Sequence, residues 1–141
     1  MTKVARVKWA GDMTFVGESP SGHAVVMDSG SGDGGLDHGI RPMEMLLLGA
    51  GGCSSIDVLL MLKKSRQKVT DCWVELEGER AAEPPRIFTK IHMHFVITGH
   101  DIDPRHVERA IKLSHDKYCS ASVQLAALAE ITSDFEIRIA D

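Results

Sequence analysis

The chain has 141 residues, of which 43% are hydrophobic and 26% are charged, and its formal net charge is −4. This length and composition predict one soluble domain covering residues 1–141. A net negative charge without a basic run argues against nucleic acid or an anionic membrane as a partner. The first eight residues interleave charged and apolar side chains, whereas a secretion signal needs a continuous apolar segment, so we expect a cytoplasmic protein.

The first third of the sequence is typical of β-strands. Apolar and polar residues alternate over 5–9 and 23–28, and we expect a further strand over 12–16. Residues 29–39 contain five glycines and predict a mobile loop. A phosphate-binding loop is disfavoured there because no Gly-Lys-Ser/Thr sequence follows.

A long helix is predicted to begin at Pro42, because proline suits the first helical position and Glu44 suits the positive end of the helix dipole. Residues 45–62 are apolar nearly all round, while Asp57 and several glycines make a membrane span unconvincing. A helix that is apolar on every side needs cover on every side. We therefore expect a core helix whose cover is completed by a second subunit.

The second half alternates strands and helices. Two long strands are predicted over 72–77 and 87–97, and Asp103 should cap a helix that begins at Pro104. A short helix capped by Ser120 or Ser122 and carrying residues 123–128 should follow, and then a closing strand over 135–139. The predicted class is α+β, with the order three strands, helix, two strands, two helices, strand.

The odd number of cysteines, and the absence of a Cys-x-x-Cys pair, argue against a secreted disulfide framework and favour thiol chemistry in a reducing compartment. Cys53 lies in mid-helix after Gly49, Gly51 and Gly52, whose cost in a helix would be explained by the close approach of another backbone or by space for a small substrate beside the sulfur. Cys119 lies at a joint between helices, where backbone amides favour a thiolate. The alternative for each is ordinary core packing, which we expect for Cys72.

Two other kinds of site are disfavoured. His92 and His94 share one strand face, but no third ligand with zinc-type spacing is evident, so a solvated strand face is favoured and no metal is predicted. The Gly-x-Ser-x-Gly motif of serine hydrolases is absent from the sequence.

The segment Pro-Met-Glu-Met-Leu-Leu-Leu-Gly-Ala-Gly-Gly-Cys-Ser-Ser-Ile-Asp at 42–57, with Tyr-Cys-Ser-Ala-Ser at 118–122, resembles the OsmC/Ohr group of osmotically inducible and organic-hydroperoxide-resistance proteins, in particular its YhfA-like branch. The resemblance covers essentially the whole chain. It implies an intertwined homodimer with a buried central helix and a site that contains both cysteines. It further implies that Cys53 attacks a peroxide, that Cys119 resolves the sulfenic acid as a disulfide, and that a dithiol such as a lipoylated protein restores the thiols.

The resemblance also points to an arginine and a glutamate that favour the thiolate. The peroxidase branches place the glutamate ten residues before the first cysteine, where this sequence has Met43. Glu44 is nine residues before Cys53, about 180° away on a regular helix, and it also suits the helix terminus. We take Glu44, with Arg41 from the glycine-rich loop, as candidate catalytic residues.

The favoured function is therefore a thiol-dependent peroxidase that reduces small organic hydroperoxides without a bound cofactor. The alternatives are a dimeric protein that binds a small molecule or thiol ligand without turnover, and a purely structural dimer.

Overall fold

The computed structural model describes residues 4–141, so the first three residues of the amino-terminal segment lie outside it. The chain divides into two compact units, one ending at Leu46 and the other running from Leu47 to Asp141. Each unit contains one three-stranded sheet. The single-domain organisation stays a prediction.

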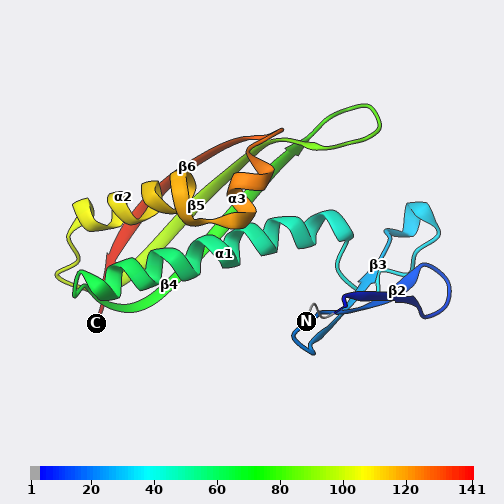
Figure 1. The fold of residues 1–141 in the computed structure, drawn as a ribbon, viewed down its shortest axis with the longest axis horizontal. Helices are drawn as coiled ribbons and strands as arrows, with labels where there is room; N and C mark the ends of the chain where they lie inside the picture. The colour runs from blue at the N-terminus through cyan, green and yellow to red at the C-terminus, as the bar shows by residue number, and fades with distance from the viewer. Residues whose placement is uncertain (1–3) are drawn as a thin grey trace. The chain divides into compact units, whose positions relative to one another are not determined.

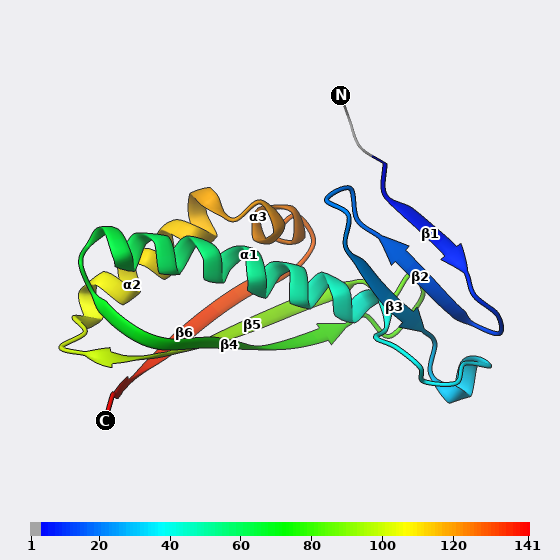
Figure 2. The same ribbon diagram turned by 90° about the horizontal axis from the view of Figure 1, so that it is seen from below.

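The first unit is an antiparallel meander of β1 (Arg6–Trp9), β2 (Thr14–Glu18) and β3 (Ala24–Asp28) (Figure 2). The glycine-rich loop that follows contains a short 3-10 turn, η1 (Ser31–Asp33). Asp28 is 2% exposed, and its carboxylate accepts hydrogen bonds from the Thr14 hydroxyl and from the backbone N–H groups of Leu36 and His38. One buried carboxylate thereby ties the loop to β3.

Helix α1 (Pro42–Lys64) begins at the proline, as predicted. The Glu44 Oε1 atom accepts the backbone N–H of Arg41 at 2.8 Å, which is one half of a capping box. Lys63 and Lys64 occupy the last turn, where the helix dipole favours cations. Among the described helices, α1 alone has the length and composition of a membrane span, which core helices of soluble proteins share.

The second unit places its helices on one face of a sheet (Figures 1 and 2). Strands β4 (Lys68–Arg80) and β5 (Phe88–His100) are antiparallel, and β6 (Glu130–Ile139) runs parallel to β5. Helix α2 (Pro104–Leu113) leads into a π-helical turn, η2 (Ser114–Tyr118), and then into α3 (Ser120–Leu125). The buried core between the layers is apolar and comprises Val58 and Leu62 of α1, Val107, Ala110 and Ile111 of α2, and Ile91, Met93, Phe95 and Ile97 of β5.

The α+β class and the element order agree with the sequence, but two local predictions are wrong. Asp103 caps α2 as expected, accepting the N–H of Arg105 at 2.9 Å. Cys119, not Ser120 or Ser122, caps α3, because its sulfur accepts the N–H of Ser122. Helix α3 also ends at Leu125, which leaves Leu128 outside the helix and exposed.

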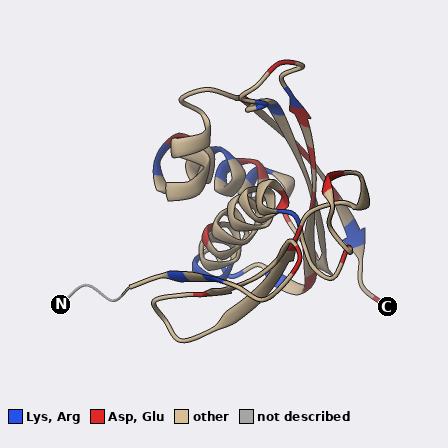
Figure 3. Cartoon of the chain, turned by 90° about the vertical axis from the view of Figure 1, so that its right-hand side faces the viewer, with Lys and Arg blue, Asp and Glu red and all other residues tan. Residues whose placement is uncertain are grey.

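Helix α1 is buried along only part of its circumference. Leu48, Ile56 and Leu60 are 63%, 63% and 53% exposed, and together with Gly52 they recur every fourth residue along one face. Asp57 is the one charged residue within 45–62, and the ribbon of α1 is accordingly mostly tan in Figure 3. The helix is therefore apolar nearly all round, as predicted, and the rest of the described chain leaves one of its faces uncovered.

Candidate active site

Cys53 lies in the middle of α1 and is half-buried. A side chain at Gly52 would meet no atom within 4 Å, so the helix surface just before Cys53 is open. At Gly51, by contrast, a side chain would approach the Leu76 Cδ1 atom to 2.7 Å. Gly51 therefore permits close packing against a side chain of β4, where the sequence suggested another backbone, and space for a substrate beside Cys53 stays a prediction.

Cys119 lies at the junction of η2 and α3 and is 0% exposed. Its backbone N–H closes the π-helical turn on the carbonyl of Ser114 at 2.8 Å. Its sulfur accepts the N–H of Ser122 at 3.3 Å, while the thiol lies 4.0 Å from the carbonyl oxygen of Ala50 on α1. A wide turn of this kind often marks a functional site, and here it turns the cysteine towards α1.

The fold brings the two cysteines together with an acid. The sulfurs of Cys53 and Cys119 and a carboxylate oxygen of Asp57 lie within 4.8 Å of one another. Because Asp57 follows Cys53 by four residues, both side chains share one face of α1. Two thiols at this separation need only small side-chain movements to form a disulfide.

A buried chain of hydroxyl groups supports the acid. Ser54 and Ser114 are both 0% exposed, their hydroxyl oxygens are 3.0 Å apart, and Ser114 donates to the Asp57 Oδ2 atom at 3.2 Å. Ser114 donates its one hydroxyl proton to the carboxylate, so Ser54 is the donor in the hydrogen bond between the two serines. Sequence reasoning missed these three residues, although Asp57 is the one charged residue within 45–62 and stands one turn after Cys53.

Burial raises the pKa of the Cys119 thiol, and the neighbouring Cys53 raises it further, while hydrogen bonding from Ser122 acts in the opposite direction. The thiol form of Cys119 is accordingly favoured at neutral pH. Burial also raises the pKa of Cys72.

Arg41 and Glu44 belong to the first unit, and their hydrogen bonds there are local. Arg41 pairs with Asp37 at 2.8 Å and donates to the carbonyl of Gly39 at 3.0 Å, while Glu44 caps α1. Both residues therefore have structural roles. Their contribution to catalysis stays a prediction.

Comparison with known proteins identifies the family. The family described as OsmC-like protein matches residues 32–134. Protein YhfA of Escherichia coli strain K12 is 50% identical over 133 residues, which cover 94% of this chain and 96% of YhfA. The chain belongs to the OsmC-like protein family.

Solved structures of similar fold agree with this assignment. A hypothetical protein from Aquifex aeolicus VF5 matches the OsmC-like chain with a TM-score of 0.86 and 28% identity, covering all of this chain and 99% of the other. The organic hydroperoxide resistance protein OhrB of Bacillus subtilis matches with a TM-score of 0.64 and 15% identity over 94% of this chain and 98% of OhrB. At that identity the likeness to OhrB concerns the fold.

The ligand atoms of Cys53, Asp57 and Cys119 in this OsmC-like protein are also close enough to one another to share a metal ion. The sequence prediction that no metal is bound considered His92 and His94 and overlooked this group.

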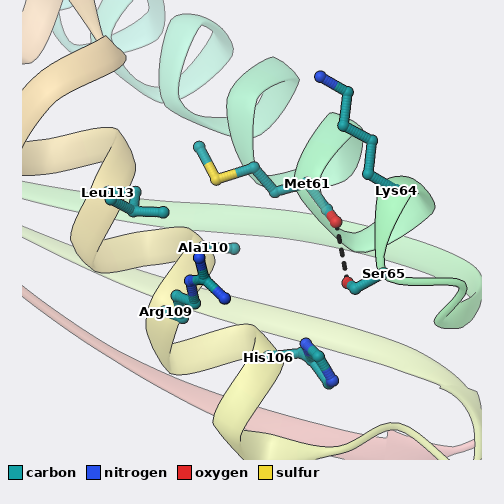
Figure 4. A pocket seen from close by; sticks show the side chains of 7 residues that line it. All are labelled: Met61, Lys64, Ser65, His106, Arg109, Ala110 and Leu113. Atoms are coloured by element: carbon teal, nitrogen blue, oxygen red, sulfur yellow. Dashed lines mark hydrogen bonds between the residues drawn. The ribbon is translucent and has the colours of Figure 1, made fainter.

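A separate pocket of about 250 Å³ lies between the carboxyl-terminal part of α1 and helix α2 (Figure 4). Met61, Ala110 and Leu113 supply apolar contacts, while Lys64 and Arg109 supply positive charge. None of its lining residues is a cysteine, so this pocket of the OsmC-like protein is distinct from the thiol site.

Proposed function

We propose that this OsmC-like protein is a thiol-dependent peroxidase that reduces small organic hydroperoxides. The observation that carries the proposal is the approach of the Cys53 and Cys119 sulfurs to within 4.8 Å, one half-buried and the other fully buried. Several proteins that share this fold are organic hydroperoxide resistance proteins, including those from Legionella pneumophila and Elizabethkingia anophelis.

The exposure of the two sulfurs supports different roles for them. Cys53 is half-buried whereas Cys119 is fully buried, so a small peroxide reaches the Cys53 sulfur more readily. The Cys53 thiolate attacks the terminal peroxide oxygen, the O–O bond breaks, and the alkoxide leaves as the alcohol after taking a proton. Cys119, which is 0% exposed, is shielded from the peroxide but lies within reach of the resulting sulfenic acid.

The cycle then closes through thiol exchange. Cys119 condenses with the Cys53 sulfenic acid, water leaves, and a disulfide joins α1 to the start of α3. An external dithiol, such as a lipoyl group on a partner protein, reduces this disulfide. No bound cofactor is required, and a reducing cytoplasm suits a cycle that starts from free thiols.

We also propose that the protein is a homodimer. The face formed by Leu48, Gly52, Ile56 and Leu60 is apolar or small, and it is uncovered in the described chain. A second copy presents the same face, so two α1 helices can bury each other across a two-fold axis. Light scattering should report twice the chain mass, Ile56→Arg should reduce it towards the monomer, and Leu128→Arg should leave it unchanged. A wild-type monomer that is folded at micromolar concentration would contradict the dimer.

A peroxide assay tests the function. Wild-type protein with excess dithiol should consume many equivalents of cumene hydroperoxide. Binding of a small molecule or a thiol ligand without peroxide consumption would support the non-catalytic alternative instead. If the cysteines also resisted small alkylating reagents, the structural-dimer alternative would stand.

A further inference from the structure

The position of Asp57 calls for a chemical role, because its carboxylate lies beside both thiols. One of its oxygens is within 4.8 Å of the Cys53 and Cys119 sulfurs. The buried hydroxyl chain from Ser54 through Ser114 holds the carboxylate there, with a hydrogen bond of 3.2 Å to its Oδ2 atom. A carboxylate fixed in this place is within reach of a proton on the Cys119 sulfur.

The resolving cysteine has a proton to lose. Cys119 is 0% exposed, so bulk solvent does not reach its thiol, and burial favours the protonated form. Its other polar neighbours are Ser122, whose N–H and hydroxyl are donors to the sulfur, and the carbonyl of Ala50 at 4.0 Å, which is not basic. Asp57 is the one ionisable oxygen acid in the group formed with the two sulfurs.

We propose that Asp57 is the proton-transfer residue of the resolving step. As the Cys119 sulfur attacks the sulfenic sulfur of Cys53, the Asp57 carboxylate takes the Cys119 proton. The S–O bond of the sulfenic acid breaks, and Asp57 passes that proton to the departing hydroxide, which leaves as water. One S–S bond forms, the Cys53 sulfur is reduced and the Cys119 sulfur is oxidised, and Asp57 ends unchanged. This step rests on the proposed peroxidase function.

The hydroxyl chain gives Ser114 a positioning role. Its bond to Oδ2 fixes the carboxylate plane and leaves the second oxygen free to approach the thiol. Ser114 is the first residue of η2 and Cys119 directly follows η2, so the same turn places both the hydroxyl and the thiol.

The test follows the two half-reactions separately after one equivalent of cumene hydroperoxide, with no reductant present. Asp57→Asn keeps the size of the side chain and an oxygen that accepts from Ser114, but it cannot take a proton. Cys53 sulfenic acid, trapped with a dimedone-type reagent, should form at a rate within about threefold of wild type. Formation of the Cys53–Cys119 disulfide should be slower by about a hundredfold at pH 7, the lower end of general acid–base effects.

The pH profile separates proton transfer from a structural effect. In Asp57→Asn the disulfide rate should rise about tenfold per pH unit between pH 6 and 8, because the reaction then depends on free Cys119 thiolate, while the wild-type rate changes less. Asp57→Glu should restore part of the rate at pH 7. Asp116→Asn is the matched control, since Asp116 is exposed and pairs with Lys112 at 2.7 Å, and it should match wild type in both half-reactions.

The outcomes are distinct. Normal sulfenic acid formation with an unchanged disulfide rate and pH profile in Asp57→Asn would overturn the role of Asp57 and leave the peroxidase function standing. Absence of both Cys53 sulfenic acid and the Cys53–Cys119 disulfide in the wild-type protein would overturn both. If Asp57→Asn does not fold, Ser114→Ala should still slow disulfide formation more than sulfenic acid formation, and equal effects on both steps would contradict the proposal.

Discussion

The thiol site and the outer face of the β4–β5–β6 sheet both contain clustered ionisable side chains. On the outer face these side chains have hydrogen-bond partners, whereas at the thiol site they are incompletely paired. On the outer face, His92 bonds Thr132 and Asp134, and His94 bonds Asp134 and Glu136, at 2.7 to 3.1 Å. Every imidazole nitrogen of this pair has a partner.

At the thiol site the groups are more buried and incompletely paired. Cys53 and Cys119 face each other and the Asp57 carboxylate within 4.8 Å, and the protein's bonds to Asp57 come from one serine chain. A cluster of ionisable residues is therefore not by itself a functional site. The thiol site differs from the histidine face because its ionisable groups lie together away from solvent and lack a full set of hydrogen-bond partners.

The largest expected effect comes from the sulfur that the peroxide reaches. Cys53→Ser should lower peroxide consumption to the rate measured without protein, because no other half-exposed thiol has a resolving partner in the group. Cys72→Ser is the matched control and should stay within about twofold of wild type. Retained turnover in Cys53→Ser would reverse the roles of the cysteines.

Cys119→Ser should permit one turnover and then stall. The attacking thiol is intact, but the sulfenic acid at Cys53 has no partner with which to condense. Peroxide consumption should stop at about one equivalent per chain, and Cys53 should accumulate a dimedone adduct and then overoxidise under excess peroxide. Trapping of sulfenic acid at Cys119 in the wild type would contradict this assignment.

A smaller effect, on the free energy of unfolding, is expected where Ser54 and Ser114 bond the Asp57 carboxylate. Ser114→Ala leaves Ser54 without an acceptor and Asp57 without a donor, and an unsatisfied buried polar group costs about 1–3 kcal/mol. Urea unfolding should show that loss, whereas Ser120→Ala, at an exposed position, should change the free energy of unfolding little.

The smallest effect should come from the outer face. The carboxylates of Glu136 and Asp134 raise the pKa of His94 above its ordinary value of 6.5. The folded state therefore holds the His94 proton more tightly, and this stabilisation is present below pH 6.5 and fades as the pH rises through the raised pKa. His94→Ala should lower the urea midpoint slightly at pH 5, and at pH 9 the ionic contribution to that loss should be gone. The control His23→Ala, at an exposed position, should change the midpoint equally at both pH values. An equal loss at both pH values would contradict the ionic contribution.

Much of the fold was predictable from the sequence because it follows local patterns. Alternation predicted β4 and β5, and the proline start with an apolar run predicted α1. The cap of α3 was mispredicted because serine is the usual cap, whereas the π-helical turn rotates the sulfur of Cys119 onto the N–H of Ser122. Such a turn has no signature in a single sequence.

The candidate site was predictable in part. The two cysteines stood out by their surroundings in the sequence, but the approach of Asp57 to Cys119, 62 residues later, depends on how α2 and η2 return to α1. Long-range pairings of this kind leave no periodic pattern. The spacing of Asp57 from Cys53 was visible in the sequence, but the hydrogen bond by which Ser114 holds the carboxylate was not.

The most direct measurement of the central claim is peptide mass spectrometry of the wild-type protein after one equivalent of an organic hydroperoxide. We expect a linked pair of peptides containing Cys53 and Cys119 within one chain, with Cys72 recovered as a free thiol. A bridge that contains Cys72, or sulfonic acid at Cys53 without any bridge, would contradict the account.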